Sequence, residues 1–251
     1  MGALNSELTV VTCSKNDISG LKRTLESLTN FRSDMPKLVL VLSDYSETEI
    51  ELIKVEFNML SPDIYQINSN GIYNAQNFGL NIVKTRLMLV LNGGDSLISP
   101  KSLENLVDKI GKRDWGYGAC RFVDPNLGSA RVYKYLNYSR LLHRLGLRFV
   151  PHPSVVVDAD KARKFGGFDL HYKIAADQKM LLQFANTSAP VTIPETIASF
   201  ELGGASSRKS SEIVSDFRRI SNEIFGYFFN SKVVDKIVWF LVLTIRQNLG
   251  R

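Results

Sequence analysis

The sequence has few of the residues that build disulfide frameworks and metal clusters. Its 251 residues include two cysteines and three histidines, and neither set has the close spacing of a zinc site. Cys13 and Cys120 both lie in apolar surroundings, so we expect reduced core residues, as in cytoplasmic proteins. The shortage argues against a disulfide-stapled fold and against a histidine-based metal cluster.

Long apolar runs are also absent. No segment approaches the roughly 20 apolar residues that a membrane-spanning helix needs, and the N-terminus lacks the basic start and apolar core of a signal peptide. We therefore expect a cytoplasmic protein. Hydrophobic residues make up 44% and charged residues 22% of the chain, which is typical of a folded protein with a sizeable core.

The charge is positive but not concentrated. The formal net charge of +6 suggests an acidic partner, which could be nucleic acid, an anionic membrane surface or a phosphorylated substrate. Basic residues are scattered through 121–148 and the C-terminal segment, without a Lys/Arg block or a nucleic-acid motif. The distribution favours a membrane surface or a phosphorylated substrate and predicts no nucleic-acid partner.

What the sequence does contain is an alternation of strand and helix patterns. The strands expected in the first hundred residues are 8–13, 38–42, 64–67 and 87–91. Helical spacing separates them, which predicts right-handed crossovers and a mostly parallel sheet. The pattern then changes to short strands at 115–123, 130–135 and 155–157, a helix at about 176–185, and mostly helix from 210 onward. We predict an α/β protein with a nucleotide-binding half at 6–98, an acceptor-side half at 99–209, and C-terminal helices at 210–251.

The most informative stretch is 87–95. Five apolar residues run without alternation and stop at Asn92-Gly93-Gly94-Asp95, which is typical of a central strand buried on both faces. Ligands bind at the carboxyl ends of such strands, and the glycines allow a close backbone approach before a carboxylate. We predict that Asp95 holds a divalent metal and, through it, the diphosphate of a nucleotide sugar. The alternative is a Gly-Gly turn whose Asp caps the next helix.

Five stretches occur in an order typical of one family. They are LTVVTCSKNDISGLKRTLESL at 8–28, GIYNAQNFGL at 71–80, LVLNGGD at 89–95, GGFDLHYKIAADQKMLL at 166–182 and SFELGGAS at 199–206. Each is weak alone. Together, over about residues 6–206, they resemble the inverting family 2 glycosyltransferases of the GT-A fold. Within that family the likeness is greatest to bacterial enzymes that build exopolysaccharide, capsule, colanic acid or O-antigen.

The resemblance implies a donor site around Asp95. This residue matches the last acidic position of the family's metal-binding motif, which binds Mn²⁺ or Mg²⁺ on the donor diphosphate and spreads the charge of the leaving group. Asn92 matches the first position of the motif. The other donor-side residues that we predict are Thr12, Asp44, Asn74, Gly93 and Gly94.

The resemblance also implies an acceptor side. Asp177 matches the catalytic base, which deprotonates the acceptor hydroxyl as it attacks the anomeric carbon. Its alternative role is to cap or to occupy the first turn of a helix. His152 matches a position near the acceptor and the diphosphate, although Pro153 replaces the usual glutamine there; its alternative role is that of a loop residue.

Two positions depart from the family pattern. Ser43 stands where an acidic residue usually follows the second strand, with Asp44 one place along. Ser69 replaces another acidic residue two places before Gly71. Both changes remove contacts that would select the base and ribose, so donor identity stays open.

The C-terminal stretch 233–251 has two interpretations. Its apolar run at 237–245 is too short to span a bilayer, but it carries Trp239 and Phe240 and has Lys and Arg on both sides. Such a segment can lie on a membrane surface, which would make the protein peripheral on the inner face of the cell membrane. It can equally pack on the domain or on a second subunit.

The leading functional hypothesis is a metal-dependent, inverting glycosyltransferase. It would move a sugar from a nucleotide-sugar donor to a lipid-linked or oligosaccharide acceptor in bacterial surface polysaccharide biosynthesis. The departures at Ser43 and Ser69 motivate a second hypothesis, a degraded GT-A domain that serves as a scaffold or binding subunit of a polysaccharide assembly complex. A nucleotidyltransferase is a third, but the glycine-rich triphosphate loop it would need is absent from residues 12–16.

Overall fold

The computed structural model describes residues 4–31, 34–124, 128–134, 137–201 and 210–249. Four parallel strands form the N-terminal half of one sheet, in the spatial order β3-β2-β1-β4. Their bounds are β1 (Leu8–Lys15), β2 (Lys37–Ser43), β3 (Asp63–Gln66) and β4 (Leu87–Val90). The parallel nucleotide-binding half expected from the sequence is confirmed.

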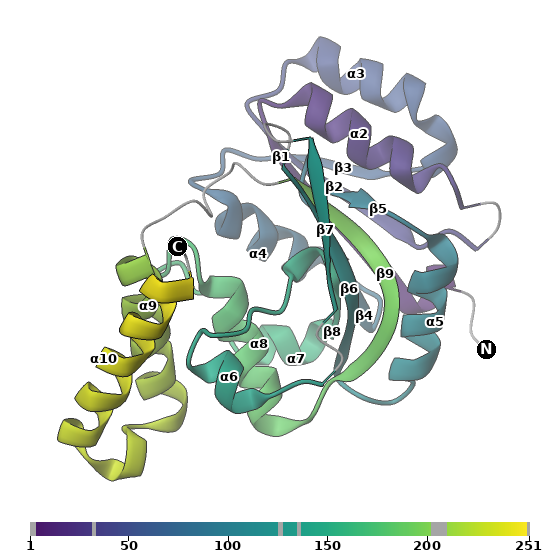
Figure 1. Cartoon of the computed structure of the whole chain (residues 1–251). Helices are drawn as coiled ribbons and strands as arrows, with labels where there is room; N and C mark the ends of the chain where they lie inside the picture. The colour runs from purple at the N-terminus through teal and green to yellow at the C-terminus, as the bar shows by residue number, and fades with distance from the viewer. Residues whose placement is uncertain (1–3, 32–33, 125–127, 135–136, 202–209, 250–251) are drawn as a thin grey trace.

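The second half continues the same sheet. β4 pairs antiparallel with β8, and the spatial order then runs β8-β6-β9-β5, with β7 paired to β6. The strands are β5 (Ser96–Leu97), β6 (Trp115–Asp124), β7 (Ser129–Tyr133), β8 (Val155–Asp158) and β9 (Val191–Glu201). β9 runs parallel to β6 and ends beside β5, so it carries the chain across this half of the sheet (Figure 1).

Helices cover both faces of the sheet (Figure 1). The helices on one face are α2 (Ile18–Leu28), α3 (Glu47–Glu56) and α5 (Pro100–Ile110), and those on the other are α4 (Ile72–Ile82), α7 (Ala159–Lys164) and α8 (Ala176–Thr187). In β4, Leu87 and Leu89 pack under the first set, whereas Met88 and Val90 pack under the second. The prediction that this strand is buried on both faces is confirmed.

Two long helices end the chain. α9 (Ser210–Phe225) and α10 (Lys232–Leu249) form a hairpin beside α8 (Figure 1). The remaining elements are short: α1 (Leu4–Glu7), α6 (Arg140–Arg144) and the 3-10 segments Asn58–Leu60, His152–Ser154 and Phe228–Asn230. Within the described ranges, no helix is long and apolar enough to cross a membrane. Residues 202–206 of the motif at 199–206 lie outside the described residues.

Candidate active site

The turn Asn92–Asp95 sits where the carboxyl ends of β1 and β4 meet, next to the start of α2. The Gly93 amide donates to the Cys13 carbonyl at 2.9 Å, and the Gly94 amide donates to Thr24 Oγ1 at 3.0 Å. Gly94 has a φ of +100°, and a Cβ on Gly93 would lie 2.7 Å from Ser14 Oγ. Glycine is therefore required at both positions, by backbone conformation at one and by close packing at the other.

Asp95 is held inside this turn. Its side chain is 4% exposed, and Oδ2 accepts a hydrogen bond from the Asn92 amide at 3.0 Å. Burial raises the pKa of the carboxyl to about 8, and the nearby charge of Glu201 acts in the same direction. The next helix is capped by Ser99, whose Oγ accepts from the Ser102 amide at 3.2 Å. The alternative in which Asp95 caps that helix is therefore wrong.

The surroundings of Asp95 suit a divalent cation. Among the described residues, its side chain makes no other hydrogen bond and no ion pair, so the buried carboxylate lacks a positive partner. The described residues also contain no group of three or more His, Cys, Asp or Glu side chains placed to hold a metal ion by themselves. A cation here would take one oxygen from Asp95 and its other ligands from a diphosphate and water, as Mg²⁺ commonly does.

The side chain of Asn92 has a hydrogen-bond partner within the fold, whereas the hydroxyl of Thr12 has none among the described residues. Asn92 Oδ1 accepts from Gln76 Nε2 of α4 at 2.9 Å. Thr12 is fully buried, and its hydroxyl has no hydrogen-bond partner in the described chain. The donor-binding role of Thr12 stays a prediction.

The remaining donor-side residues lie at the same edge or beside it. Asp44 follows β2 with a φ of +58° and forms an exposed ion pair with Lys15, with Oδ2 and Nζ 3.2 Å apart. Asn74 is half-buried in the first turn of α4. Their donor-binding roles stay predictions.

Asp177 occupies the first turn of α8, and both of its carboxylate oxygens accept hydrogen bonds. The Tyr73 hydroxyl is shared between the Ile174 carbonyl and Oδ1, which lies 3.2 Å away, and Oδ2 accepts from Gln178 Nε2 at 2.9 Å. Burial of Tyr73 and, after it, the Asp177 charge raise the pKa of that phenol well above its usual value. Asp177 is not the N-cap, which is Ala175, so only the first-turn part of its alternative role is confirmed.

Helix α4 contacts both Asp177 and the turn that carries Asp95. Tyr73 reaches Asp177, and Gln76, one turn further along the same helix, reaches Asn92 in the turn of Asp95. Residues three apart lie on one helix face. The structure thus brings Asn92, in the turn of Asp95, and Asp177 to the same face of α4, although 82 positions separate Asp95 from Asp177 in the sequence.

His152 lies near Asp177. Its ring packs edge-on against Phe168 with centroids 5.4 Å apart. Burial lowers the pKa of His152, while the negative charge of Asp177 opposes that shift. His152 is therefore more than an isolated loop residue, and its acceptor-side role stays a prediction.

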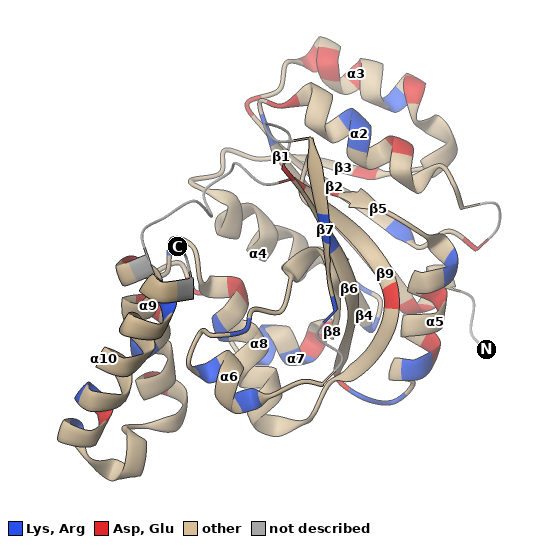
Figure 2. Ribbon diagram, viewed as in Figure 1, with Lys and Arg blue, Asp and Glu red and all other residues tan. Residues whose placement is uncertain are grey.

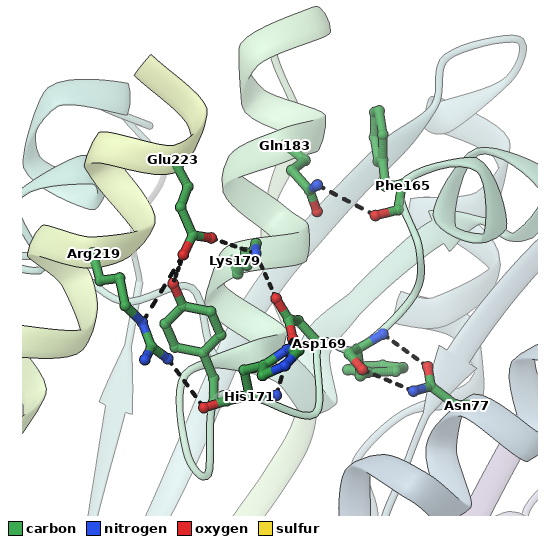
Figure 3. A network of polar contacts seen from close by, with 10 residues as sticks. Asn77, Phe165, Asp169, His171, Lys179, Gln183, Arg219 and Glu223 are labelled. Atoms are coloured by element: carbon green, nitrogen blue, oxygen red, sulfur yellow. Dashed lines mark hydrogen bonds and ion pairs between the residues drawn. The ribbon is translucent and has the colours of Figure 1, made fainter. Parts of the chain in front are cut away.

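The loop that leads to Asp177 is fixed by polar contacts (Figure 3). Asn77 of α4 donates to the Phe168 carbonyl and accepts from the Phe168 amide, both at 2.8 Å. Lys179 donates to Asp169 and to Glu223 of α9, both at 2.5 Å. The loop, α8 and the C-terminal hairpin are thereby tied together around Asp177.

The two departures from the family pattern lie next to each other. Ser43 Oγ donates to Ser69 Oγ at 2.8 Å, and both side chains are buried. The pair lies at the carboxyl end of β2 and carries no charge. The positions that usually supply two carboxylates therefore form one closed hydroxyl pair.

Sequence reasoning missed Tyr73, Gln178 and Glu201. Tyr73 lies within the GIY motif and Gln178 follows Asp177, so their positions were the available signal. A cavity of about 500 Å³ opens at the opposite, amino-terminal edge of the sheet, lined by Asn5, Asp34 and Tyr65 among others, and none of the predicted site residues lines it.

Comparison with known proteins places these features in a family. The model of glycosyl transferase family 2 matches residues 9–160, more than half of the chain. An uncharacterized glycosyltransferase of Mycobacterium tuberculosis is 28% identical over 227 residues, which cover 86% of this chain and 83% of the relative.

Two solved structures share the fold. S. aureus TarS (residues 1–349) in complex with UDP matches with a TM-score of 0.68 at 13% identity, covering 94% of this chain and 70% of that one. The mannosyltransferase PcManGT from Pyrobaculum calidifontis, in complex with GDP-Man and Mn²⁺, matches with a TM-score of 0.60 at 12% identity, covering 87% of this chain and 61% of that one.

Proposed function

The chain belongs to glycosyl transferase family 2, and we propose that it transfers a sugar, with inversion, from a nucleotide-sugar donor to a lipid-linked saccharide. The acceptor would belong to bacterial surface polysaccharide biosynthesis. In this proposal residues 6–98 bind the donor and residues 99–209 bind the acceptor. The observation that carries the proposal is that one face of α4 contacts both Asp177 and Asn92, which lies in the turn of Asp95.

On the donor side, Asp95 would hold Mn²⁺ or Mg²⁺ against the diphosphate. A cation bound there would spread the negative charge that develops on the departing nucleoside diphosphate. The Asn92 amide fixes the Asp95 carboxylate through Oδ2, and Gln76 fixes the Asn92 side chain. Gly93 and Gly94 let the backbone approach the donor closely.

On the acceptor side, Asp177 would act as the general base. Its carboxylate takes the proton of the acceptor hydroxyl as that oxygen attacks the anomeric carbon, and the carbon–oxygen bond to the diphosphate breaks on the opposite face. Tyr73 and Gln178 hold the carboxylate through one oxygen each. His152 lies close enough to contact the acceptor or the diphosphate.

Positions 43 and 69 are serines, so no carboxylate at either position can select the nucleotide of the donor. Structures that share the fold contain UDP, UDP-GlcNAc or GDP-Man, so this fold accepts different bases and sugars. We therefore test several nucleotide classes rather than one.

A membrane-facing surface on α10 supports a lipid-linked acceptor. One side of α10 packs on the protein through Trp239, which is 3% exposed, and Val242. The other side is apolar yet exposed, at positions that repeat every three or four residues. We call this surface the α10 stripe; its residues are Val233, Ile237, Phe240, Leu241 and Ile245. Phe229, 88% exposed, lies just before the helix begins.

The charge around the α10 stripe favours anionic lipid over a second copy of the chain. The exposed charged residues of α10 are Lys232 and Lys236, near the start of the helix, where Figure 2 shows blue on a largely tan ribbon. The one carboxylate of α10, Asp235, is fully buried and pairs with Arg218 at 2.8 Å. An apolar face with basic flanks binds anionic membrane surfaces, whereas a copy of this chain would bring a second net charge of +6.

The enzyme assay tests the chemistry. Purified protein is incubated with Mn²⁺ and a panel of UDP-, GDP- and dTDP-sugars, and released nucleoside diphosphate is measured with and without EDTA. We expect release from one donor, lost on chelation and in Asp95→Ala. Release from no donor, with or without a polyprenyl-diphosphate saccharide, together with no Mn²⁺ binding, would favour the scaffold hypothesis instead.

Vesicle flotation tests the surface. We expect the protein to bind vesicles containing phosphatidylglycerol and not vesicles of phosphatidylcholine alone. Phe240→Glu should abolish binding, whereas Gln247→Glu, which adds the same charge at an exposed polar position of α10, should reduce it only slightly. Equal binding by both variants, or a concentration-dependent dimer that Phe240→Glu dissolves, would overturn the membrane assignment.

A further inference from the structure

The side-chain amide of Gln178 uses all of its hydrogen-bonding capacity. Nε2 donates to the Val150 carbonyl at 3.0 Å and to Asp177 Oδ2 at 2.9 Å. Oε1 accepts from the Val150 amide at 3.3 Å and lies 3.1 Å from His143 Nε2. An amide has two donors and two acceptor sites, so each is satisfied. Gln178 is buried and cannot rotate without breaking several of these bonds.

The backbone of Val150 determines the direction of the whole chain of bonds. Its amide can only donate, which identifies the atom it meets as Oε1, and its carbonyl can only accept, which identifies the other atom as Nε2. His143 must then donate from Nε2 to Oε1. Since burial lowers the pKa of His143 to about 4, the ring is neutral at pH 7, and its Nδ1 accepts from the Tyr138 hydroxyl at 2.9 Å.

Every bond in this chain therefore donates toward Asp177. The order is Tyr138 hydroxyl to His143, His143 to Gln178, and Gln178 to the Asp177 carboxylate. The chain joins the loop before α6, α6 itself and α8. Consecutive hydrogen bonds with one direction polarise one another in a buried setting. The other titratable groups that face Asp177 are Tyr73 from α4, which donates to Oδ1, and His152.

We propose that Gln178 is a positioning residue for the catalytic base, and that His143 and Tyr138 hold Gln178 in the one orientation that serves Asp177. This inference rests on the proposed role of Asp177. The Gln178 amide fixes the rotamer of the Asp177 carboxylate, because the carboxylate can rotate only if it loses its hydrogen bond to the buried Nε2. A carboxylate fixed in this way keeps its oxygens in the geometry that receives the acceptor's proton.

The kinetic test compares two glutamines of α8. Gln178→Leu should lower kcat about 10- to 100-fold, because a misplaced base loses reaction geometry, and should leave the KM for the donor within about twofold. Gln183→Leu is the control: its amide donates to the Phe165 carbonyl at 3.3 Å (Figure 3) and not to Asp177, and we expect wild-type kinetics.

A second measurement needs no variant in the network to fold. Nitrogen NMR of the three histidines in the wild-type protein, assigned with single substitutions of His152 and His171, should show His143 neutral at pH 7 with its proton on Nε2. A charged His143, or a proton on Nδ1, would overturn the direction of the chain and with it the proposal.

The two levels of inference fail in different ways. Full activity in Asp177→Asn would remove the proposed base itself. An inactive Asp177→Asn together with a wild-type kcat in Gln178→Leu would leave the base in place and overturn the positioning role alone.

Discussion

The two carboxylates of the site have opposite surroundings. Asp95 is buried, has one backbone donor, and lacks a positive partner among the described residues. Asp177 is only half-buried, and each of its oxygens accepts from a side chain of the protein. The proposed cation would therefore complete the surroundings of Asp95, whereas the protein alone already supplies a donor to each oxygen of Asp177. The difference teaches that, among the described residues, the fold provides side-chain hydrogen bonds for one carboxylate and only a backbone donor for the other.

Asp177→Asn, which changes the carboxylate with two side-chain contacts, should lower activity most severely. The amide cannot take a proton from the acceptor, so we expect the transfer rate to fall about 10²- to 10⁴-fold, the usual contribution of a general base. The affinity for the donor should not change, because Asp177 lies on the acceptor side. Steady-state kinetics and donor titration measure both quantities. Normal transfer by this variant would show that another group is the base.

Asp95→Ala, which removes the carboxylate without a positive partner, should weaken donor binding. We expect Mn²⁺-dependent donor affinity to fall about 100-fold, since the substitution removes the one buried carboxylate of the turn. Calorimetric titration of donor with and without Mn²⁺ measures the change. Asp108→Ala, at an exposed position of α5, is the control. An unchanged Mn²⁺ effect in Asp95→Ala would contradict the ligand role.

The pH dependence of unfolding should sharpen the comparison, because His143 belongs only to the Asp177 side. Its folded pKa of about 4 lies below the unfolded value. Its contribution to stability is therefore fully present above about pH 6.5 and is lost as the pH falls toward 4, by about 2 kcal/mol at pH 5.

The measurement is urea unfolding at pH 7 and pH 5. In His143→Gln the loss between the two pH values should be smaller by about 2 kcal/mol, while His152 contributes equally in both proteins. An identical pH dependence in wild type and variant would mean that His143 already titrates normally in the fold.

Substitutions in the Ser43–Ser69 pair should have the smallest effect, because this pair is neutral, unlike the two carboxylates. Ser43→Ala leaves the Ser69 hydroxyl buried without its partner and should cost about 1 kcal/mol of unfolding free energy. The double variant Ser43→Ala/Ser69→Ala should cost less than the sum of the two single variants, as chemical denaturation can show. Strict additivity would mean that the two hydroxyls do not interact.

Local patterns predicted the central elements well. The unbroken apolar run at 87–91 correctly indicated burial on both faces, because its alternate residues enter two separate cores. Ser99-Pro100 is a typical helix start, and α5 begins there because the side-chain cap and the first-turn proline act locally. These features depend on near neighbours in the sequence, which is why periodicity and turn chemistry were sufficient.

Features that depend on distant partners were not predicted. β9 was missed because Pro194 and Glu195 interrupt its apolar pattern, and register shifts in its pairing with β6 accommodate the irregularity. The pairing of Ser43 with Ser69 and the bonds of Gln178 to Val150 and His143 join segments 26 to 35 residues apart. No spacing rule reports such contacts, since they exist only once the chain has folded.

The fully used amide of Gln178 also has an evolutionary consequence. No other natural side chain of that length offers two donors and two acceptors, so a single substitution at 178 leaves a buried partner unpaired. A lineage can leave this arrangement only by changing positions 143 and 178 in concert. Among descendants of a common ancestor, we therefore expect these two sites to be inherited as a unit, while the exposed residues around them drift freely.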